Sequence, residues 1–185
     1  AIPHYITAVS TVALVAGGRS QDRPIIEKAR VYLVENMLDE GEGVAKSDFW
    51  YGGMGYGGTT RADGRRADMI SLEYALSAMK EAELPETSDA WKKAITFLQR
   101  TQNNSETNDQ KWAANDGGFV YYPGFSYYGE GGTTRSYGSV SYAGILSYTW
   151  ANVKKDDNRV KAVVKWIQAN YTVDENPGMG QKTVY

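Results

Sequence analysis

Two arginines in matching loops are the clearest candidates for ligand chemistry in this sequence. Arg61 and Arg135 each end the pentapeptide Gly-Gly-Thr-Thr-Arg, which occurs twice in the chain. A guanidinium group can hydrogen-bond the carbonyls of its own loop while the glycines supply the turn conformations. It can also act as a fork for the carboxylate or phosphate groups of a ligand. We expect each arginine to brace its loop, with anion binding as the alternative.

Aromatic side chains gather in the loop before the second pentapeptide. Residues 121–128 contain Phe125 and four tyrosines, Tyr121, Tyr122, Tyr127 and Tyr128. Aromatic residues in long loops often pack over helix ends as a small secondary core, and we expect this arrangement here. The alternative is that they line a cavity for an isoprenoid or stack on sugar rings.

Carboxylates are scattered along the chain. Asp68 begins an apolar stretch, so we expect an exposed aspartate that caps a helix. We interpret the pair Asp156 and Asp157 as a helix cap as well. An enzyme that works with two carboxylates would have to bring together residues such as Asp63, Asp68 or Asp116.

Composition excludes several kinds of site. The 185 residues include no cysteine and one histidine, His4, which rules out thiolate catalysis, cysteine-ligated metals and multi-histidine sites. The polar segment 104–116 lacks the spacing of an EF-hand, so we expect a solvated loop there. The sequence therefore predicts no metal and no cofactor. We expect His4 to be exposed at a fraying terminus.

Charge and hydropathy narrow the range of partners. The chain has 20 basic and 22 acidic residues, a net charge of −2, and no basic stripe, which argues against nucleic acid. No apolar run approaches the roughly 20 residues that cross a bilayer. The absence of an initiator methionine and of a basic leader indicates a processed chain or an excised fragment. Secretion, a periplasmic location and a cytoplasmic location all stay open.

Helical periodicity occurs in six segments. Apolar residues recur at three- and four-residue spacing in each of them. The predicted helices cover 3–16, 23–38, 68–83, 88–102, 137–152 and 156–170. No strand of any length is predicted, apart from a short extended piece at 118–122.

The six segments form an internal repeat. Residues 29–33 match residues 94–98 at a shift of 65, and Trp166-Ile167 match after a further shift of 69. We predict an all-α fold of three helix hairpins, at 1–66, 67–135 and 136–185, joined by long glycine-rich loops. The alanine-rich first helices would form an inner layer and the amphipathic second helices an outer one, with the loops at one end.

One segment carries a resemblance to a known family. Residues 97–102, Phe-Leu-Gln-Arg-Thr-Gln, followed by Gly117-Gly118-Phe119, resemble the QW repeat of squalene and oxidosqualene cyclases, with an insertion at 103–115 and phenylalanine for tryptophan. Met37 and Tyr171 occupy the glutamine position in the other two copies. The stretches DGGFVYYPG and SYGSVSYAGILSY look like bacterial proteins with prenyltransferase/squalene-oxidase repeats. The resemblance implies an α/α toroid, of which this chain would form a partial ring.

The catalytic motifs of that superfamily are missing. Squalene-hopene cyclases open an inner helix with Asp-x-Asp-Asp-Thr, where this chain has only Asp68, and prenyltransferases use a zinc-bound cysteine. The resemblance therefore implies a module that binds a hydrophobic or carbohydrate ligand, or a protein partner. The alternative is a terpenoid cyclase-type or carbohydrate-active enzyme whose site is completed by a missing part of the chain or by a second copy.

The last predicted helix suggests self-association. It carries more apolar surface than one neighbouring hairpin would cover, and an exposed apolar patch usually marks an interface. We expect either that the chain continues past Tyr185 or that two copies complete one another. The apolar residues of this helix are Val160, Val163, Val164, Trp166 and Ile167.

Overall fold

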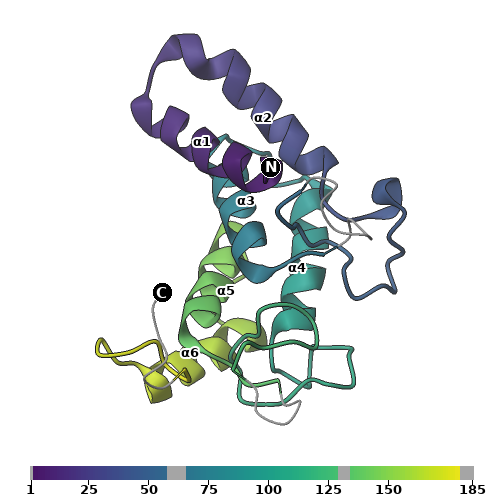
Figure 1. Ribbon diagram of the computed structural model, residues 1–185, viewed down its shortest axis with the longest axis vertical. Coiled ribbons are helices and arrows are strands. Elements are labelled where there is room, and N and C mark those ends of the chain that lie inside the picture. Colours follow the sequence, from purple (N-terminus) through teal and green to yellow (C-terminus); the bar gives the residue numbers. More distant parts are fainter. Residues whose placement is uncertain (1, 58–65, 129–133, 180–185) are drawn as a thin grey trace.

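The computed structural model describes residues 2–57, 66–128 and 134–179 (Figure 1). As predicted, the regular structure of these residues is helical, and it includes no β-strand. Segment 118–122 contributes only to two isolated bridges, Gln102 with Phe119 and Tyr122 with Phe125. Two 3-10 turns cover Ser20–Asp22 and Glu40–Glu42. The α-helices are α1 (Pro3–Gly17), α2 (Arg23–Glu35), α3 (Met69–Glu81), α4 (Asp89–Thr101), α5 (Gly138–Trp150) and α6 (Asn158–Asn170).

Side-chain caps fix where three of the helices begin. Asp68 accepts a hydrogen bond from the backbone N–H of Ser71 at the start of α3. Ser88 does the same for α4, and Asp157 accepts from the N–H of Arg159 at the start of α6. An N-cap of this kind satisfies a backbone donor that the helix itself leaves unpaired. The predicted capping roles of Asp68 and Asp157 are therefore confirmed.

The helices form two layers. In the first layer α3 contacts α1 on one side and α5 on the other. The second layer consists of α2, α4 and α6, which contact α1, α3 and α5, respectively. In addition, α2 contacts α3, and α4 contacts α5. The order runs from α1 and α2 at the top of Figure 1 to α5 and α6 at the bottom.

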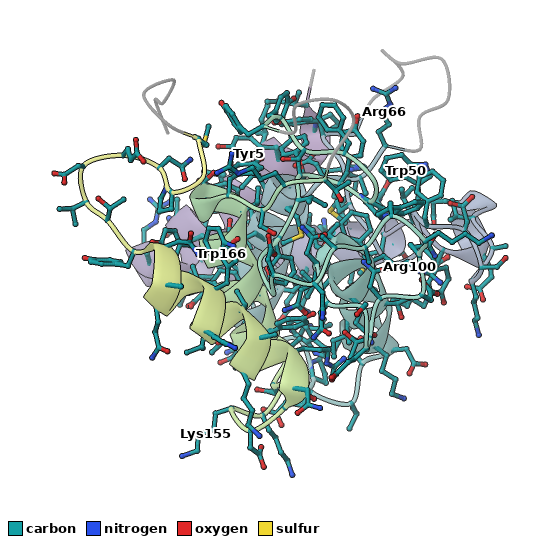
Figure 2. All side chains as sticks on the ribbon, turned by 90° about the horizontal axis from the view of Figure 1, so that it is seen from below. Tyr5, Trp50, Arg66, Arg100, Lys155 and Trp166 are labelled. Carbon is teal, nitrogen blue, oxygen red and sulfur yellow. The ribbon has the colours of Figure 1, made fainter. Side chains whose placement is uncertain are left out.

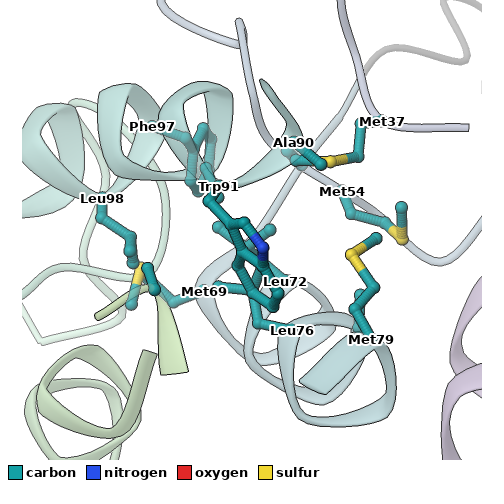
Figure 3. Close-up of a cluster of buried hydrophobic side chains, with 14 of the residues drawn as sticks. Met37, Met54, Met69, Leu72, Leu76, Met79, Ala90, Trp91, Phe97 and Leu98 are labelled. Carbon is teal, nitrogen blue, oxygen red and sulfur yellow. The ribbon is translucent and has the colours of Figure 1, made fainter. Parts of the chain in front are cut away.

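The core lies between the two layers. Figure 3 shows its centre, where α3 contributes Leu72, Leu76 and Met79, and α4 contributes Trp91 and Phe97. Methionines supply much of the remaining volume, since unbranched side chains fill irregular gaps well. Met37 and Met54, from the loop between α2 and α3, are almost fully buried in the same cluster.

The long loops cover the N-terminal ends of the first-layer helices. The N–H of His4 in α1 donates to the carbonyl of Tyr56, and that of Met69 in α3 donates to Tyr121. In α5, the N–H of Gly138 donates to the carbonyl of Pro177. Figure 2 shows Trp50 and Arg66 of the first loop on the side opposite Lys155, in the short turn between α5 and α6. The loops therefore share one end of the helix stack, as predicted.

Backbone hydrogen bonds in the first two loops recur at a fixed spacing. Leu38 exchanges hydrogen bonds with Gly52 and Gly53 in the first loop. Asn103 does the same with Gly117 and Gly118, and all three positions are shifted by 65. We call residues 65 apart in the first two hairpins, and 69 apart in the second and third, matching positions.

Glycine is required where these loops touch the next helix of the second layer. Gly52 has a φ of +79°, and a Cβ there would lie 1.8 Å from the carbonyl oxygen of Lys93 in α4. Gly117 has a φ of +89°, and its Cβ would lie 2.5 Å from the carbonyl oxygen of Ala162 in α6. L-residues rarely adopt such φ values. The glycine pairs thus let each loop lie directly against the following hairpin.

Gln102 joins the second hairpin to the third through a buried network. Its amide nitrogen donates to the carbonyls of Gly117 and Arg159, at 3.0 and 2.9 Å. Its amide oxygen accepts from the Tyr148 hydroxyl at 2.9 Å. The positions that match Gln102 and Tyr148 in the preceding pair of hairpins hold Met37 and Met79, which are buried in the apolar core. A polar pair thus occupies one junction and an apolar pair the other.

Two expectations about exposure are wrong in the first and last helices. His4 is half-buried: its Nδ1 lies 3.1 Å from the carbonyl oxygen of Gly55, and burial lowers the pKa of its imidazole. Segment 104–116 is a largely exposed loop, as expected, and buried Asn108 anchors it by donating to the carbonyls of Arg100 and Gln102. The apolar face of α6 is covered, with Val163 and Trp166 buried and the other three residues half-buried.

Candidate functional site

Asp68 lies at the junction of α3 and two loops, and it is buried. Its side chain accepts hydrogen bonds from the N–H and the hydroxyl of Ser71, both at 2.8 Å. The expectation of an exposed aspartate was wrong, since only 5% of the residue is accessible to solvent. Burial raises the pKa of its carboxyl, against the hydrogen bonds from Ser71, which lower it.

The tyrosines of the second loop divide between two aromatic groups and the core. Tyr121 meets Tyr127 with ring centroids 4.7 Å apart, and Tyr122 stacks on Phe125 at 4.5 Å. Tyr128 packs edge-on against Tyr137. Tyr121 and Tyr128 also contact the hydrophobic core, as a secondary core requires. Tyr127 differs, because 61% of it is exposed.

Tyr121 connects the aromatic loop to Asp68. Burial, and then the negative charge of Asp68, raise the pKa of the Tyr121 phenol. Burial also raises the pKa of the Tyr137 phenol, followed by the neighbouring Tyr127 and Tyr128 and then by the negative charge of Asp68. These phenols therefore stay protonated, and Tyr121 is a hydrogen-bond partner of the Asp68 carboxyl group. Asp68 and Tyr121 are the predicted site residues that the fold brings together.

Asp116, another carboxylate proposed for an enzyme, does not join Asp68. Asp116 lies in the loop before α5, where its Oδ1 accepts from the Ser136 hydroxyl at 2.7 Å and from the Gly118 N–H at 3.0 Å. Asp63 and Arg61 lie outside the described residues. Within the described ranges, no group of three or more carboxylates and histidines is placed to hold a metal ion.

Arg135 lies in a groove of about 710 Å³ between α6 and the loops around Asp116. Its guanidinium is exposed, and none of the hydrogen bonds of the described residues joins it to a loop carbonyl. Lys161 and Lys165 line the same groove, one helical turn apart on α6. In the part of the chain that is described, none of these three cations forms an ion pair. The remaining lining mixes Asn104, Asn115, Asn158 and Asn170 and the carboxylates Glu106 and Asp116 with apolar Ala162, Trp166 and Ala169.

A smaller groove lies between the first and second hairpins. Matching positions line it, but they carry different side chains. Its volume is about 290 Å³, and it lies against α4. Tyr51, Asp89, Lys92, Lys93 and Thr96 line it, and they match Asp116, Asn158, Lys161, Ala162 and Lys165 of the larger groove.

Every lysine of the α4 groove is neutralised by a carboxylate. Lys93 pairs with Asp39, Lys92 with Asp89 at 3.0 Å, and Lys46 with Glu40 at 3.5 Å. The residues that match these three carboxylates are uncharged: Asn104, Asn158 and Ser105. The α6 groove therefore lacks these three counter-charges. It keeps Lys161 and gains Lys165, but it has Ala162 in place of Lys93 and gains the carboxylates Glu106 and Asp116.

Sequence reasoning missed Lys161 and Lys165. Each appears, by itself, as an ordinary charge on the outer face of an amphipathic helix. The available signal was the comparison of matching positions, which shows Asp39 and Asp89 replaced by asparagine. Glu73 of α3 was also missed; burial raises the pKa of its carboxyl to about 7, and no described residue pairs with it.

The comparisons identify no relative. No family model, curated protein or solved structure matches the chain. Among the helices of the described ranges, none is both long and apolar enough to span a bilayer.

Proposed function

We propose that the chain is a helical-repeat module of the squalene cyclase-like α/α type, and that it binds a ligand rather than transforming one. The three hairpins α1–α2, α3–α4 and α5–α6 would be the repeats of a partial toroid. Three observations support this organisation. Adjacent first-layer helices contact each other, and backbone hydrogen bonds recur at matching positions in two loops. The close contact of Gly52 with α4 and of Gly117 with α6 is a third.

The ligand we propose is an anion with carboxylate or phosphate groups, bound in the α6 groove. The observation that carries this is the contrast between the two grooves. Lysines of the α4 groove are paired with carboxylates, whereas Arg135, Lys161 and Lys165 have no such partner among the described residues. A guanidinium binds carboxylate and phosphate in a two-pronged geometry, and lysine adds a compact charge.

The groove limits which anions fit. Its volume lies in the range of small-molecule sites, so a ligand larger than a single phosphate can enter. Four asparagine side chains offer amide donors and acceptors to uncharged polar groups. Glu106 and Asp116 repel part of a highly charged ligand, although Asp116 is already hydrogen-bonded. A ligand with one or two anionic groups and several hydroxyls matches this lining best.

Binding can be tested with inorganic pyrophosphate by isothermal titration calorimetry at low ionic strength. We expect saturable binding that weakens as salt is added, because the charges are exposed to solvent. Loss of one charge-assisted hydrogen bond costs about 1.5–3 kcal/mol, so Arg135→Gln and Lys161→Gln should each weaken binding about tenfold or more.

Lys155→Gln is the matched control. It removes the same charge from the α5–α6 turn, away from the groove (Figure 2). Equal weakening by Lys155→Gln and Lys161→Gln would show that only net charge matters, and it would contradict a site in the groove.

Asp68 supports a second candidate, acid–base catalysis at the loop face. Its buried carboxyl holds a proton to higher pH than an exposed aspartate does, and the Tyr121 phenol interacts with it. A terpenoid cyclase-type enzyme of this kind would convert squalene or a prenyl diphosphate into product. Turnover that is lost in Asp68→Asn would support this candidate over the binding module.

A further inference from the structure

Helix α1 exposes an apolar stripe along its whole length. Ile2, immediately before the helix, and Ile6, Val9 and Ala13 follow one another at four- and three-residue spacing, so they share one face. All four are exposed, and Ile6 is 53% accessible. An exposed apolar stripe of this kind normally marks a surface that packs against another element.

The matching stripe is covered on the other two helices of the first layer, where all its residues are buried except half-buried Tyr74. On α3 it consists of Ala67, Ser71, Tyr74 and Ala78, and Tyr74 contacts Tyr5 of α1 with ring centroids 5.0 Å apart. On α5 it consists of Ser136, Val140, Ala143 and Ser147, all of which are buried. This face therefore packs toward the preceding first-layer helix wherever one is present, and on α1 it has no such neighbour in the described structure.

The second layer shows the same contrast in exposure between its first helix, α2, and the later helices. Ile25 of α2 is 56% exposed, while Ala90 at the matching position of α4 is 4% exposed. The third matching residue, Arg159 of α6, offers its carbonyl to Gln102 of the preceding hairpin. Ile25 thus occupies a position that meets the preceding hairpin in both later copies.

At the other end of the helix stack, in the third hairpin, a residue is exposed whose matching residues in the first two hairpins are buried. Met37 and Gln102 are almost fully buried beneath the hairpin that follows each of them. Tyr171 stands at the matching position of the third hairpin and is 67% exposed, with exposed Val173 close behind it in the chain. The side chain that should lie under a following hairpin is therefore open to solvent.

We propose that the leading face of one copy of this chain binds the trailing face of a second copy. The leading face consists of Ile2, Ile6, Val9, Ala13 and Ile25, and the trailing face of Tyr171 and Val173. The contact would repeat a junction that the chain already forms twice internally, which is why a second copy is the occupant that fits. A contact between two different faces is heterologous, so it builds a closed ring or an open filament. This inference rests on the repeat organisation proposed above and not on the groove.

Sedimentation velocity over a range of concentrations tests this association. We expect the unmodified chain to form dimers and larger species as concentration rises. Ile6→Glu and Tyr171→Asp should each weaken association at least tenfold, because an unpaired charge is costly to bury. Tyr127→Asp is the matched control, since Tyr127 is an exposed aromatic side chain outside the two faces. Far-ultraviolet circular dichroism verifies folding, and Val9→Lys provides a second variant of the leading face.

Mixing the two face variants distinguishes head-to-tail contact from any symmetric one. The Ile6→Glu copy keeps its trailing face and the Tyr171→Asp copy keeps its leading face, so the mixture should form one-to-one pairs and nothing larger. An unmodified chain that stays monomeric at every concentration contradicts the inference, as does a mixture that forms no pairs. Loss of association with pyrophosphate binding intact counts against this inference alone. Loss of pyrophosphate binding with association intact counts against the groove alone.

Discussion

Tyr148→Phe removes one hydroxyl from the junction between the second and third hairpins, and we predict a measurable loss of stability. The hydroxyl donates to the amide oxygen of Gln102 at 2.9 Å, and both side chains are fully buried. Phenylalanine keeps the ring and its edge contact with Phe119. A buried acceptor left without a donor costs about 1–3 kcal/mol, so the free energy of unfolding should fall by that amount.

A double-mutant cycle with Gln102→Met isolates this interaction. Gln102→Met copies Met37 of the preceding junction and leaves the Tyr148 hydroxyl without its acceptor. The bonds from Gln102 to the carbonyls of Gly117 and Arg159 are lost in the single and double variants alike, so they cancel. Unfolding in urea, followed by circular dichroism, gives the four free energies. We expect a coupling energy of about 1 kcal/mol; losses that add to within about 0.3 kcal/mol would refute the network.

Three further predictions concern single side chains. Glu73→Gln should raise the free energy of unfolding at pH 8 by on the order of 2 kcal/mol, because a carboxyl with a pKa of about 7 in the folded state opposes folding once it is charged. This gain should vanish below the pKa of the unfolded state. Urea unfolding at pH 4 and at pH 8 measures both values. Asp157→Ala should cost about 1 kcal/mol by loss of the α6 cap; the Arg159 hydrogen bond lowers the pKa of Asp157 to about 2, so this difference should be full above pH 4 and disappear as the pH falls toward 2. Glu106→Gln should tighten pyrophosphate binding in calorimetry, since it removes a negative charge from the groove; unchanged or weaker binding would show that the anion lies elsewhere.

Local sequence signals predicted the helices well. Asp68 and Asp157 cap the helices that they were expected to cap, because an N-cap depends only on a short stretch of chain. The shift of 65 residues placed the glycine pairs at equivalent points, and the structure gives them the same backbone hydrogen bonds. These features depend on residues near each other in the chain or on a repeated pattern.

Burial was harder to predict, because it depends on distant loops. His4 meets the carbonyls of Gly55 and Tyr56, about fifty residues along the chain, so its own surroundings gave no sign of burial. Asp68 is covered in the same way by a loop that carries Tyr121. The open charge of the α6 groove depends on which carboxylates reach each lysine, and only the folded structure shows that Asp39 reaches Lys93.

The groove can be tested most directly by nuclear magnetic resonance during a titration with inorganic pyrophosphate. The backbone amides of Gly117 and Ser136 report on the α6 groove, and the amide of Tyr51 reports on the α4 groove. We predict saturable shifts of the Gly117 and Ser136 signals, with Tyr51 unchanged, because the α4 groove is neutralised by its own carboxylates. Equal shifts in both grooves, or no shift at Gly117 and Ser136, would contradict the proposal that the unpaired cations make the α6 groove an anion site.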